Sequence, residues 1–296
     1  MKNLFFAIVV CICFFLAGCN GKSLQIDPDD TSHIKNPTET HVQHPTDEIP
    51  FSELIHADQG TTLTINAFGL GEVTVNQKKF ADTLTSGVFT SVYILEDVQL
   101  PSHTSYLLVN LGNDFLLHNL ETKSLKDTLY LGDVDGDGIQ EIVLNQCLGY
   151  SGGVGNYLSR VFCVDKEKVT EIFASIDNRG NLNYDTGFTS VFLGNKQLCI
   201  TNSIVDYQIV LDVSERYNDD FFDNSGKCTR DIHIWCDSFS EFIPEDVNND
   251  GICEIICKQY VSLDGHADGI GYVKSILKYN EGTGQFVIIK AQFFTE

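Results

Sequence analysis

The chain is poor in basic residues, and this shortage excludes several classes of partner. Lys and Arg number 19 against 41 Asp and Glu, which gives a formal net charge of −22 at pH 7. Nucleic acids and anionic lipid headgroups are bound through clustered Lys and Arg, so we expect neither as a partner of the folded part. Such acidity is typical of a solvated, exported domain.

The sequence also lacks the short motifs of several enzyme classes. It contains no HExxH, no Walker loop, and no GxSxG or GxGxxG that opens a helix. No cysteine or histidine spacing matches a zinc site. Seven cysteines follow residue 19, and Cys228 with Cys236 could close a local disulfide in an exported protein. The absence of these motifs favours a binding protein over an enzyme and leaves an enzyme as the alternative.

Apolar residues form a long run only at the N-terminus. Lys2 precedes a nearly unbroken apolar stretch from Leu4 to Leu16, which predicts a signal peptide over residues 1–18. The stretch is shorter than the roughly 20 residues that a membrane span needs. The four residues from Leu16 to Cys19 resemble the lipobox of bacterial lipoproteins. That resemblance implies cleavage before Cys19 and acylation of its sulfur.

Residues 19–50 predict a disordered tether between the lipidated Cys19 and the folded part. Four of the six prolines of the chain lie there, among Asp, Thr, Asn and His. Such a segment buries too little apolar surface to offset its ordering entropy.

From residue 51 onward the pattern is that of short strands. Segments of four to eight residues rich in Val, Ile, Thr, Tyr and Phe alternate with Gly, Asn, Asp and Ser. No long amphipathic helix is evident, and Ser52–Ala57 predicts one or two helical turns at most. We therefore expect an all-β fold over residues 51–296, either a propeller-like repeat architecture or a β-sandwich or barrel.

Two acidic loops organise this part of the chain. Asp133, Asp135 and Asp137 occupy alternate positions, Gly138 follows at once, and Glu141 completes the first loop. The same spacing returns in Asp246, Asn248, Asp250, Gly251 and Glu254. Calcium takes six to eight oxygen ligands, and alternating carboxylates around a glycine turn can supply them. An EF-hand is excluded, because the twelfth positions are Leu144 and Cys257 instead of Glu. Tight turns without metal remain the alternative.

Each acidic loop is followed by a short apolar run that suits a buried strand, so the unit is strand, loop, strand. This unit resembles the FG-GAP/VCBS repeats of integrin-like β-propellers. The resemblance implies two calcium sites formed by loop positions one, three, five and nine and the carbonyl of position seven. The first set is Asp133, Asp135, Asp137, Ile139 and Glu141, and the second is Asp246, Asn248, Asp250, Ile252 and Glu254. The neutral Asn248 departs from the pattern.

The chain also repeats itself, which indicates an internal duplication over about 85–182 and 183–296. The two acidic loops lie 113 positions apart, and a glycine-bearing loop follows each one, at Gly149–Asn156 and Ser262–Gly271. Binding residues concentrate on loops that a rigid scaffold carries. We therefore expect recognition at the second glycine loop, which offers Asp264, His266 and Asp268; a simple connecting loop is the alternative.

These features predict a membrane-anchored surface lipoprotein, exported and facing outside the cytoplasm. Its calcium-stabilised β domain would bind an envelope or extracellular protein or a glycan. The alternative is an exported hydrolase of glycosidase or esterase type on the same scaffold, which would need carboxylates or a His–acid pair converging at one end of the domain.

Overall fold

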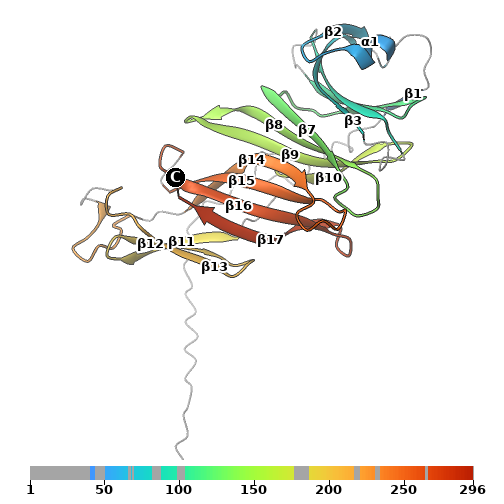
Figure 1. Ribbon diagram of the computed structural model, residues 1–296. Helices are drawn as coiled ribbons and strands as arrows, with labels where there is room; N and C mark the ends of the chain where they lie inside the picture. Colours follow the sequence, from blue (N-terminus) through green and yellow to red (C-terminus); the bar gives the residue numbers. More distant parts are fainter. Residues whose placement is uncertain are drawn as a thin grey trace, which may run out of the picture. The chain divides into compact units, whose positions relative to one another are not determined.

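The computed structural model describes ten stretches of the chain, namely 41–43, 51–65, 68, 70–81, 88–98, 104–176, 187–216, 221–230, 234–263 and 266–295. The predicted signal peptide and Cys19 lie outside the described residues, as does nearly all of the predicted tether. Figure 1 shows the described part as sheets of antiparallel strands with a single short helix. Within these stretches no helix is long and apolar enough to cross a membrane.

The first sheet has six strands in the order β1-β6-β5-β4-β3-β2. Their bounds are β1 His41–Gln43, β2 Thr62–Ile65, β3 Gly71–Phe80, β4 Ser91–Asp97, β5 Ser105–Asn110 and β6 Phe115–Asn119. The helix α1, Phe51–His56, precedes β2, in agreement with the one or two turns expected there. β1 lies inside the predicted tether. It pairs with β6, with Gln43 opposite Phe115. Residues 41–43 thus form a strand at the edge of the first sheet beside β6.

The second and fourth sheets each contain four strands that follow one another in the chain. The second runs β10-β9-β8-β7 and the fourth β14-β15-β16-β17. The bounds are β7 Lys126–Gly132, β8 Glu141–Ser151, β9 Val154–Val164 and β10 Val169–Ala174, then β14 Trp235–Glu245, β15 Glu254–Ser262, β16 Gly269–Asn280 and β17 Gln285–Phe294. In both sheets the acidic loop joins the first strand to the second. This common plan agrees with the repeat that the sequence indicates.

The third sheet is smaller, with β11 Phe188–Gly194, β12 Gln197–Asn202 and β13 Tyr207–Asp212 in sequence order. On β11 and β13 exposed positions alternate with half-buried ones, apart from the buried Phe188 at the start of β11. One face of the sheet packs against the fourth sheet, where Leu198 and Ile200 meet Val261 and Val273 in one core cluster. The opposite face leaves Val191 and Leu193 exposed.

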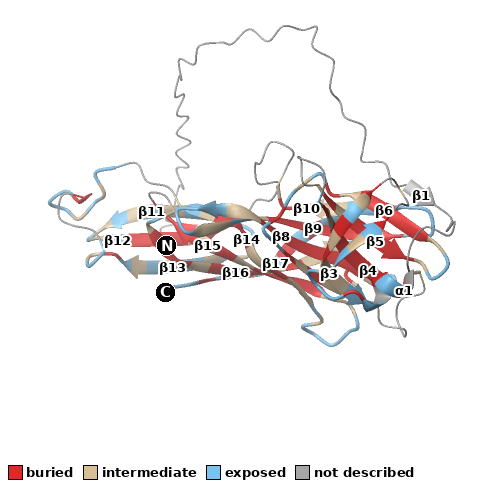
Figure 2. Ribbon diagram, turned by 90° about the horizontal axis from the view of Figure 1, so that it is seen from above, coloured by how far each residue is buried: buried red, intermediate tan, exposed pale blue. Residues whose placement is uncertain are grey.

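Three core clusters fix the neighbours of each sheet (Figure 2). β4, β5 and β6 share a cluster with β7, β8 and β9. The other face of the second sheet packs on the fourth sheet, where Val143 and Val161 meet Phe242 and Ile255. The third cluster joins the fourth sheet to the third. The second and third sheets thus both pack on the same face of the fourth sheet, because Ile255 and Val261 lie on one side of β15.

The expectation of an all-β fold is confirmed. The described residues form four antiparallel sheets, none of them closed. The disulfide considered from the sequence, between Cys228 and Cys236, is not formed. All seven cysteines after residue 19 are free thiols.

Candidate functional site

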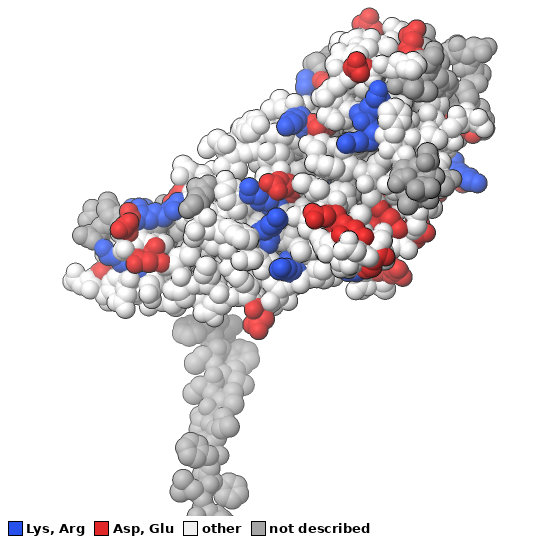
Figure 3. Space-filling view, viewed as in Figure 1, with Lys and Arg blue, Asp and Glu red and all other residues white. Residues whose placement is uncertain are grey.

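The first acidic loop brings its carboxylates together. The carboxylate oxygens of Asp133, Asp135 and Asp137 lie within 4.8 Å of one another. Asp133 accepts hydrogen bonds from the backbone N–H groups of Gly136 at 2.8 Å and of Gly138 at 3.0 Å. Both glycines have φ of +85°, a conformation that costs glycine little, so the local sequence itself closes this turn. Figure 3 shows acidic side chains gathered at the end of the sheets where this loop lies.

Glu141 and Cys163 complete the surroundings of the first loop. Glu141 is 1% exposed and accepts a hydrogen bond from the N–H of Val134 at 2.8 Å. Burial, with the charges of the three aspartates, raises the pKa of Glu141 to about 8. The Cys163 thiol sulfur lies 3.8 Å from Oδ2 of Asp135, and burial raises its pKa to about 12. A bound cation would relieve the repulsion among these carboxylates, so the donor set fits a divalent ion that prefers oxygen.

The second loop has hydrogen bonds between acidic side chains and backbone N–H groups similar to those of the first. Asp246 accepts hydrogen bonds from the N–H groups of Asp250 at 3.1 Å and Gly251 at 2.9 Å. Asp250 accepts one from the N–H of Ile252 at 2.9 Å, as Asp137 accepts one from the N–H of Ile139 at 2.7 Å. In both loops the acidic side chains thus accept hydrogen bonds from backbone N–H groups of their own turn.

The second loop differs from the first because a lysine enters it. The ammonium nitrogen of Lys278 lies 3.0 Å from Oε1 of Glu254 and 3.8 Å from Oδ2 of Asp250. The amide nitrogen of Asn248 donates to Asp250 at 3.0 Å and to Glu254 at 3.3 Å. Hydrogen bonding to Glu254 raises the pKa of Lys278, which keeps the ammonium charged. The carboxylates of the second loop thus already face a positive charge of the chain itself.

Strand register shows that Lys278 and Cys163 occupy equivalent places. Phe162 on β9 lies opposite Ile142, the residue after Glu141. Leu277 on β16 lies opposite Ile255, the residue after Glu254. Cys163 and Lys278 each follow directly, so one copy places a thiol beside the acids where the other places an ammonium group.

The two acidic loops are neighbours. The N–H of Cys253 donates to the backbone oxygen of Asp133 at 2.6 Å. A Cβ on Gly136 would lie 2.9 Å from Cδ1 of Ile252, so the absence of a side chain there allows the close approach. Ordering of one loop is therefore coupled to the position of the other.

The two glycine-bearing loops meet at the opposite end of β8 and β15. A Cβ built on Gly152 would lie 3.2 Å from Cβ of His266. Between these loops and the start of β14 lies a cleft with an inner cavity of about 210 Å³ and an outer one of about 680 Å³. Val154, Gly155, Ser238 and His266 line both parts. Both loops singled out from the sequence thus belong to one site.

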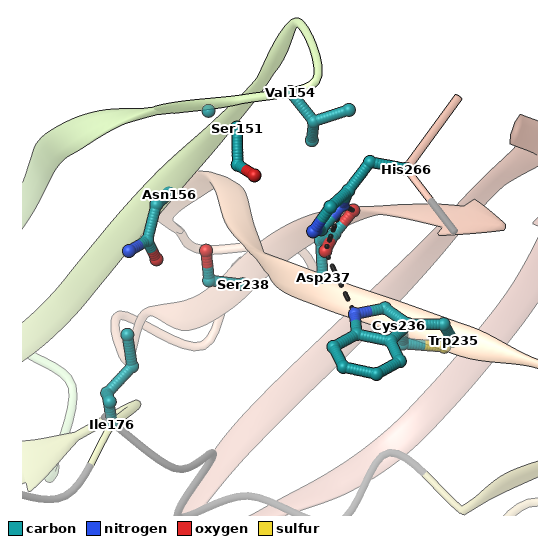
Figure 4. A pocket seen from close by; sticks show the side chains of 10 residues that line it. Ser151, Val154, Asn156, Ile176, Trp235, Cys236, Asp237, Ser238 and His266 are labelled. Carbon is teal, nitrogen blue, oxygen red and sulfur yellow. Dashed lines mark hydrogen bonds and ion pairs between the residues drawn. The ribbon is translucent and has the colours of Figure 1, made fainter. Parts of the chain in front are cut away.

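The inner cavity is built around Asp237 (Figure 4). Its carboxylate accepts from Nδ1 of His266, 3.1 Å from Oδ1 and 3.2 Å from Oδ2, and from Nε1 of Trp235, 3.1 Å from Oδ1. Burial raises the pKa of Asp237, while the His266 charge opposes that shift. The bond to Asp237 fixes the tautomer of His266 and leaves Nε2 as its group for a ligand.

A break in strand pairing positions Asp237 and Ser238. The register between β14 and β15 shifts between Cys236 and Phe239, and such bulges turn side chains out of the regular alternation. The hydroxyl of Ser238 accepts a hydrogen bond from the N–H of Tyr157 at 2.7 Å, which ties β14 to β9 beside the cavity. Ser151, Asn156 and Ser238 add further polar groups to the inner lining (Figure 4).

The outer cavity is aromatic. Tyr260 and Tyr272 lie edge to face, with ring centroids 5.6 Å apart, and Tyr157 lines the same space. The Lys258 ammonium lies 4.4 Å from the centroid of the Tyr272 ring and 3.4 Å from Oε1 of Glu241. The one cationic lysine of this lining is therefore paired with a carboxylate.

Of the three residues expected to recognise a ligand, His266 lies in the cleft. Asp268 pairs with Arg216 at 3.4 Å and is not part of the lining of the two cavities. Asp264 lies outside the described residues. Trp235 and Asp237 were not singled out from the sequence. A signal for them was present, because Trp235 is the one tryptophan of the chain and begins a strand two residues before an acid.

The fold defines the protein as an all-β protein of open antiparallel sheets, with two acidic loops at one end and a cleft at the other. The family described as the YybI C-terminal domain matches residues 186–294, a segment that includes the second acidic loop and His266. The chain is also similar to "Uncharacterized protein YybI" of Bacillus subtilis (strain 168), at 26% identity over 160 residues. This match covers 52% of the chain and 57% of the relative, so the chain spans little more than half of that relative's length. No solved structure matches the chain.

Proposed function

We propose that this protein is an exported, lipid-anchored surface protein whose calcium-stabilised β domain binds a ligand in the cleft between the two glycine-bearing loops. The lipobox-like residues from Leu16 to Cys19 support the anchor. The acidic balance of the chain supports a solvent-facing location outside the cytoplasm.

The first acidic loop is the observation that carries the calcium part of the proposal. Three aspartates with mutually close oxygens, and a buried glutamate beside them, form an oxygen-rich donor set. Asp133, Asp135, Asp137 and Glu141 would hold the ion with the carbonyl of Ile139. The ion would offset part of the negative charge of the loop and fix the turn between β7 and β8. The second loop would hold calcium more weakly, because Lys278 already offsets part of its negative charge.

The FG-GAP/VCBS likeness is proposed at the level of the four-stranded unit. Two such units carry the acidic loop between their first and second strands, which supports the likeness. A propeller packs each blade on the next one in the chain, whereas here the second and third sheets both pack on one face of the fourth. We therefore propose propeller-type repeat units in an arrangement that departs from consecutive blades.

Thermal unfolding with and without calcium tests the proposal directly. At a free calcium concentration one hundred times the dissociation constant, one site adds about 2.7 kcal/mol to the free energy of unfolding. The full-length protein in mild detergent should melt at a higher temperature in calcium than in EDTA, while magnesium at equal concentration should have a smaller effect. Equal melting temperatures in calcium and EDTA would rule out the calcium part.

An exported hydrolase is the second candidate, because His266 and Asp237 form the His–acid pair that such an enzyme needs. A base held by a carboxylate beside hydroxyl groups is the arrangement of many hydrolytic sites. Ser151 and Ser238 both line the same cavity (Figure 4). Assays with nitrophenyl esters and glycosides decide between the two: a hydrolase would lose turnover in His266→Ala, whereas a binding protein would show none in the parent.

A further inference from the structure

The cleft contains an exposed aromatic side chain that is held in a fixed orientation. Trp235 is 59% exposed, yet its indole nitrogen is bound to Asp237 at 3.1 Å. The ring of His266 meets it edge to face, with centroids 6.0 Å apart. Exposed aromatic surface is usually minimised in a folded protein, and a ring pinned at the mouth of a cavity is suited to stacking on a ligand.

The polar groups around this ring are either neutral side chains or charged side chains paired with an opposite charge. Ser151, Asn156 and Ser238 can each donate and accept hydrogen bonds, and Asp237 accepts only. Lys258 is paired with Glu241, so the lining offers no unpaired lysine or arginine for a phosphate or carboxylate. The carboxylates of Asp237 and Glu241 would repel such anions further.

The backbone also allows a ligand to approach closely. Gly152 and Gly153 adopt φ of +56° and +87° at the tip of the first loop. A Cβ on Gly155 would lie 2.4 Å from Cε2 of Tyr157, so this position requires glycine to keep the Tyr157 ring against the cleft. The outer cavity then extends from His266 past Tyr157 to Tyr260 and Tyr272, which gives the cleft length as well as depth.

A sugar chain matches these features. Each pyranose ring presents apolar C–H faces that stack on aromatic rings, and a rim of hydroxyl groups that both donate and accept. We propose that the cleft binds an uncharged oligosaccharide, with one sugar in the inner cavity against Trp235 and the next ones along Tyr260 and Tyr272. This inference rests on the proposed function of the cleft as the binding site and adds the class of ligand.

The single tryptophan makes the test specific, because its fluorescence reports this cleft alone. The full-length protein in mild detergent is first applied to a glycan array that holds neutral, amino and acidic oligosaccharides. The strongest neutral oligosaccharide is then titrated against the protein while tryptophan emission and heat of binding are recorded. We expect a saturable change in emission, and at least tenfold weaker binding by calorimetry in Trp235→Ala, which corresponds to about 1.4 kcal/mol.

Phe80→Ala is the matched control, since Phe80 on β3 is 58% exposed and is not part of the cleft lining. This variant should bind as the parent does. Tyr272→Ala should weaken binding of a long oligosaccharide more than binding of its monosaccharide. Melting curves of each variant establish that it is folded.

Three outcomes would overturn the inference. These are array binding confined to acidic glycans, no binding of any glycan by the folded parent, or a bound glycan that leaves Trp235 emission and the Trp235→Ala affinity unchanged. The calcium-dependent melting of the parent is measured separately. A failure of the sugar inference therefore leaves the calcium part of the proposed function intact and distinguishable.

Discussion

Lys278 on β16 places its ammonium nitrogen 3.0 Å from Oε1 of Glu254, a carboxylate that is 1% exposed. The two residues lie 24 positions apart in the chain, and the pairing of β15 with β16 brings them together. A buried carboxylate needs a compensating charge. In the second acidic loop a side chain of the protein supplies it, whereas in the first loop Cys163 stands at that place and brings no positive charge.

The first prediction follows from this pairing. Replacement of Lys278 by Met removes the ammonium group and keeps most of the apolar stem, so the second loop regains an unneutralised set of carboxylates. Calorimetry should find one tight calcium site in the parent and two in Lys278→Met. The variant should also melt below the parent in EDTA, because Glu254 is left buried without its cation.

Lys274→Met on the same strand is the control for Lys278→Met. Lys274 is exposed, and its replacement removes the same charge from β16. It should leave both the calcium stoichiometry and the melting temperature in EDTA at the parent values. Two tight sites in the parent would contradict the role given to Lys278.

The second prediction concerns the first acidic loop. In Asp135→Asn the side-chain oxygen can still accept the N–H of Asp137, so the turn is kept while one charge is lost. We expect the calcium-dependent rise in melting temperature to shrink strongly and the metal-free melting temperature to stay equal or increase. Differential scanning calorimetry in calcium and in EDTA measures both.

Glu215→Gln serves as the charge-matched control for Asp135→Asn, because Glu215 is exposed and lies in the turn after β13. It should retain the full calcium effect. A full calcium effect in Asp135→Asn would mean that the ion binds elsewhere.

The third prediction is a pH dependence centred on His118 of β6. This side chain is buried beside Phe162, with ring centroids 5.4 Å apart, and burial together with the charge of Arg160 lowers its pKa from 6.5 to about 4. The unfolded chain therefore binds a proton at His118 between pH 6.5 and 4 while the folded chain does not. The stability contribution is present above the unfolded pKa and is lost as the pH falls toward 4.

From pH 7 to pH 5 this residue should lower the free energy of unfolding by about 2 kcal/mol. Urea unfolding at several pH values measures the loss. His118→Gln should remove this component, so that the difference in stability between the variant and the parent changes with pH over this window. A constant difference would contradict the lowered pKa.

The sequence predicts local features of this protein well and contacts across sheets poorly. The spacing of Asp133, Asp135 and Gly138 determines which backbone N–H groups the two aspartate side chains can accept. The first loop therefore follows from the residues alone. The all-β class follows in the same way from short alternating segments. Both depend on neighbours within a few positions.

The cleft could not be predicted, because residues from distant segments build it. Asp237 is positioned by a bulge between β14 and β15, and His266 reaches it from the loop before β16. The role of Lys278 depends on strand register, which a single sequence does not specify. The order of the sheets depends on which apolar faces pack together, and several faces of similar composition compete for that contact.

The last prediction concerns the membrane anchor and rests on the sequence from Leu16 to Cys19. If cleavage occurs before Cys19 and its sulfur is acylated, each buried CH₂ of the acyl chains contributes about 0.8 kcal/mol to membrane attachment. Cys19→Ser removes the acylated atom, so the protein should move from the membrane fraction to the medium or periplasm. Metabolic labelling with an alkyne fatty acid should mark the parent and not the variant. Cys13→Ser, a cysteine change within the apolar stretch, should keep both the label and the membrane fraction. A Cys19→Ser protein that still fractionates with membranes would show that another feature of the chain attaches it.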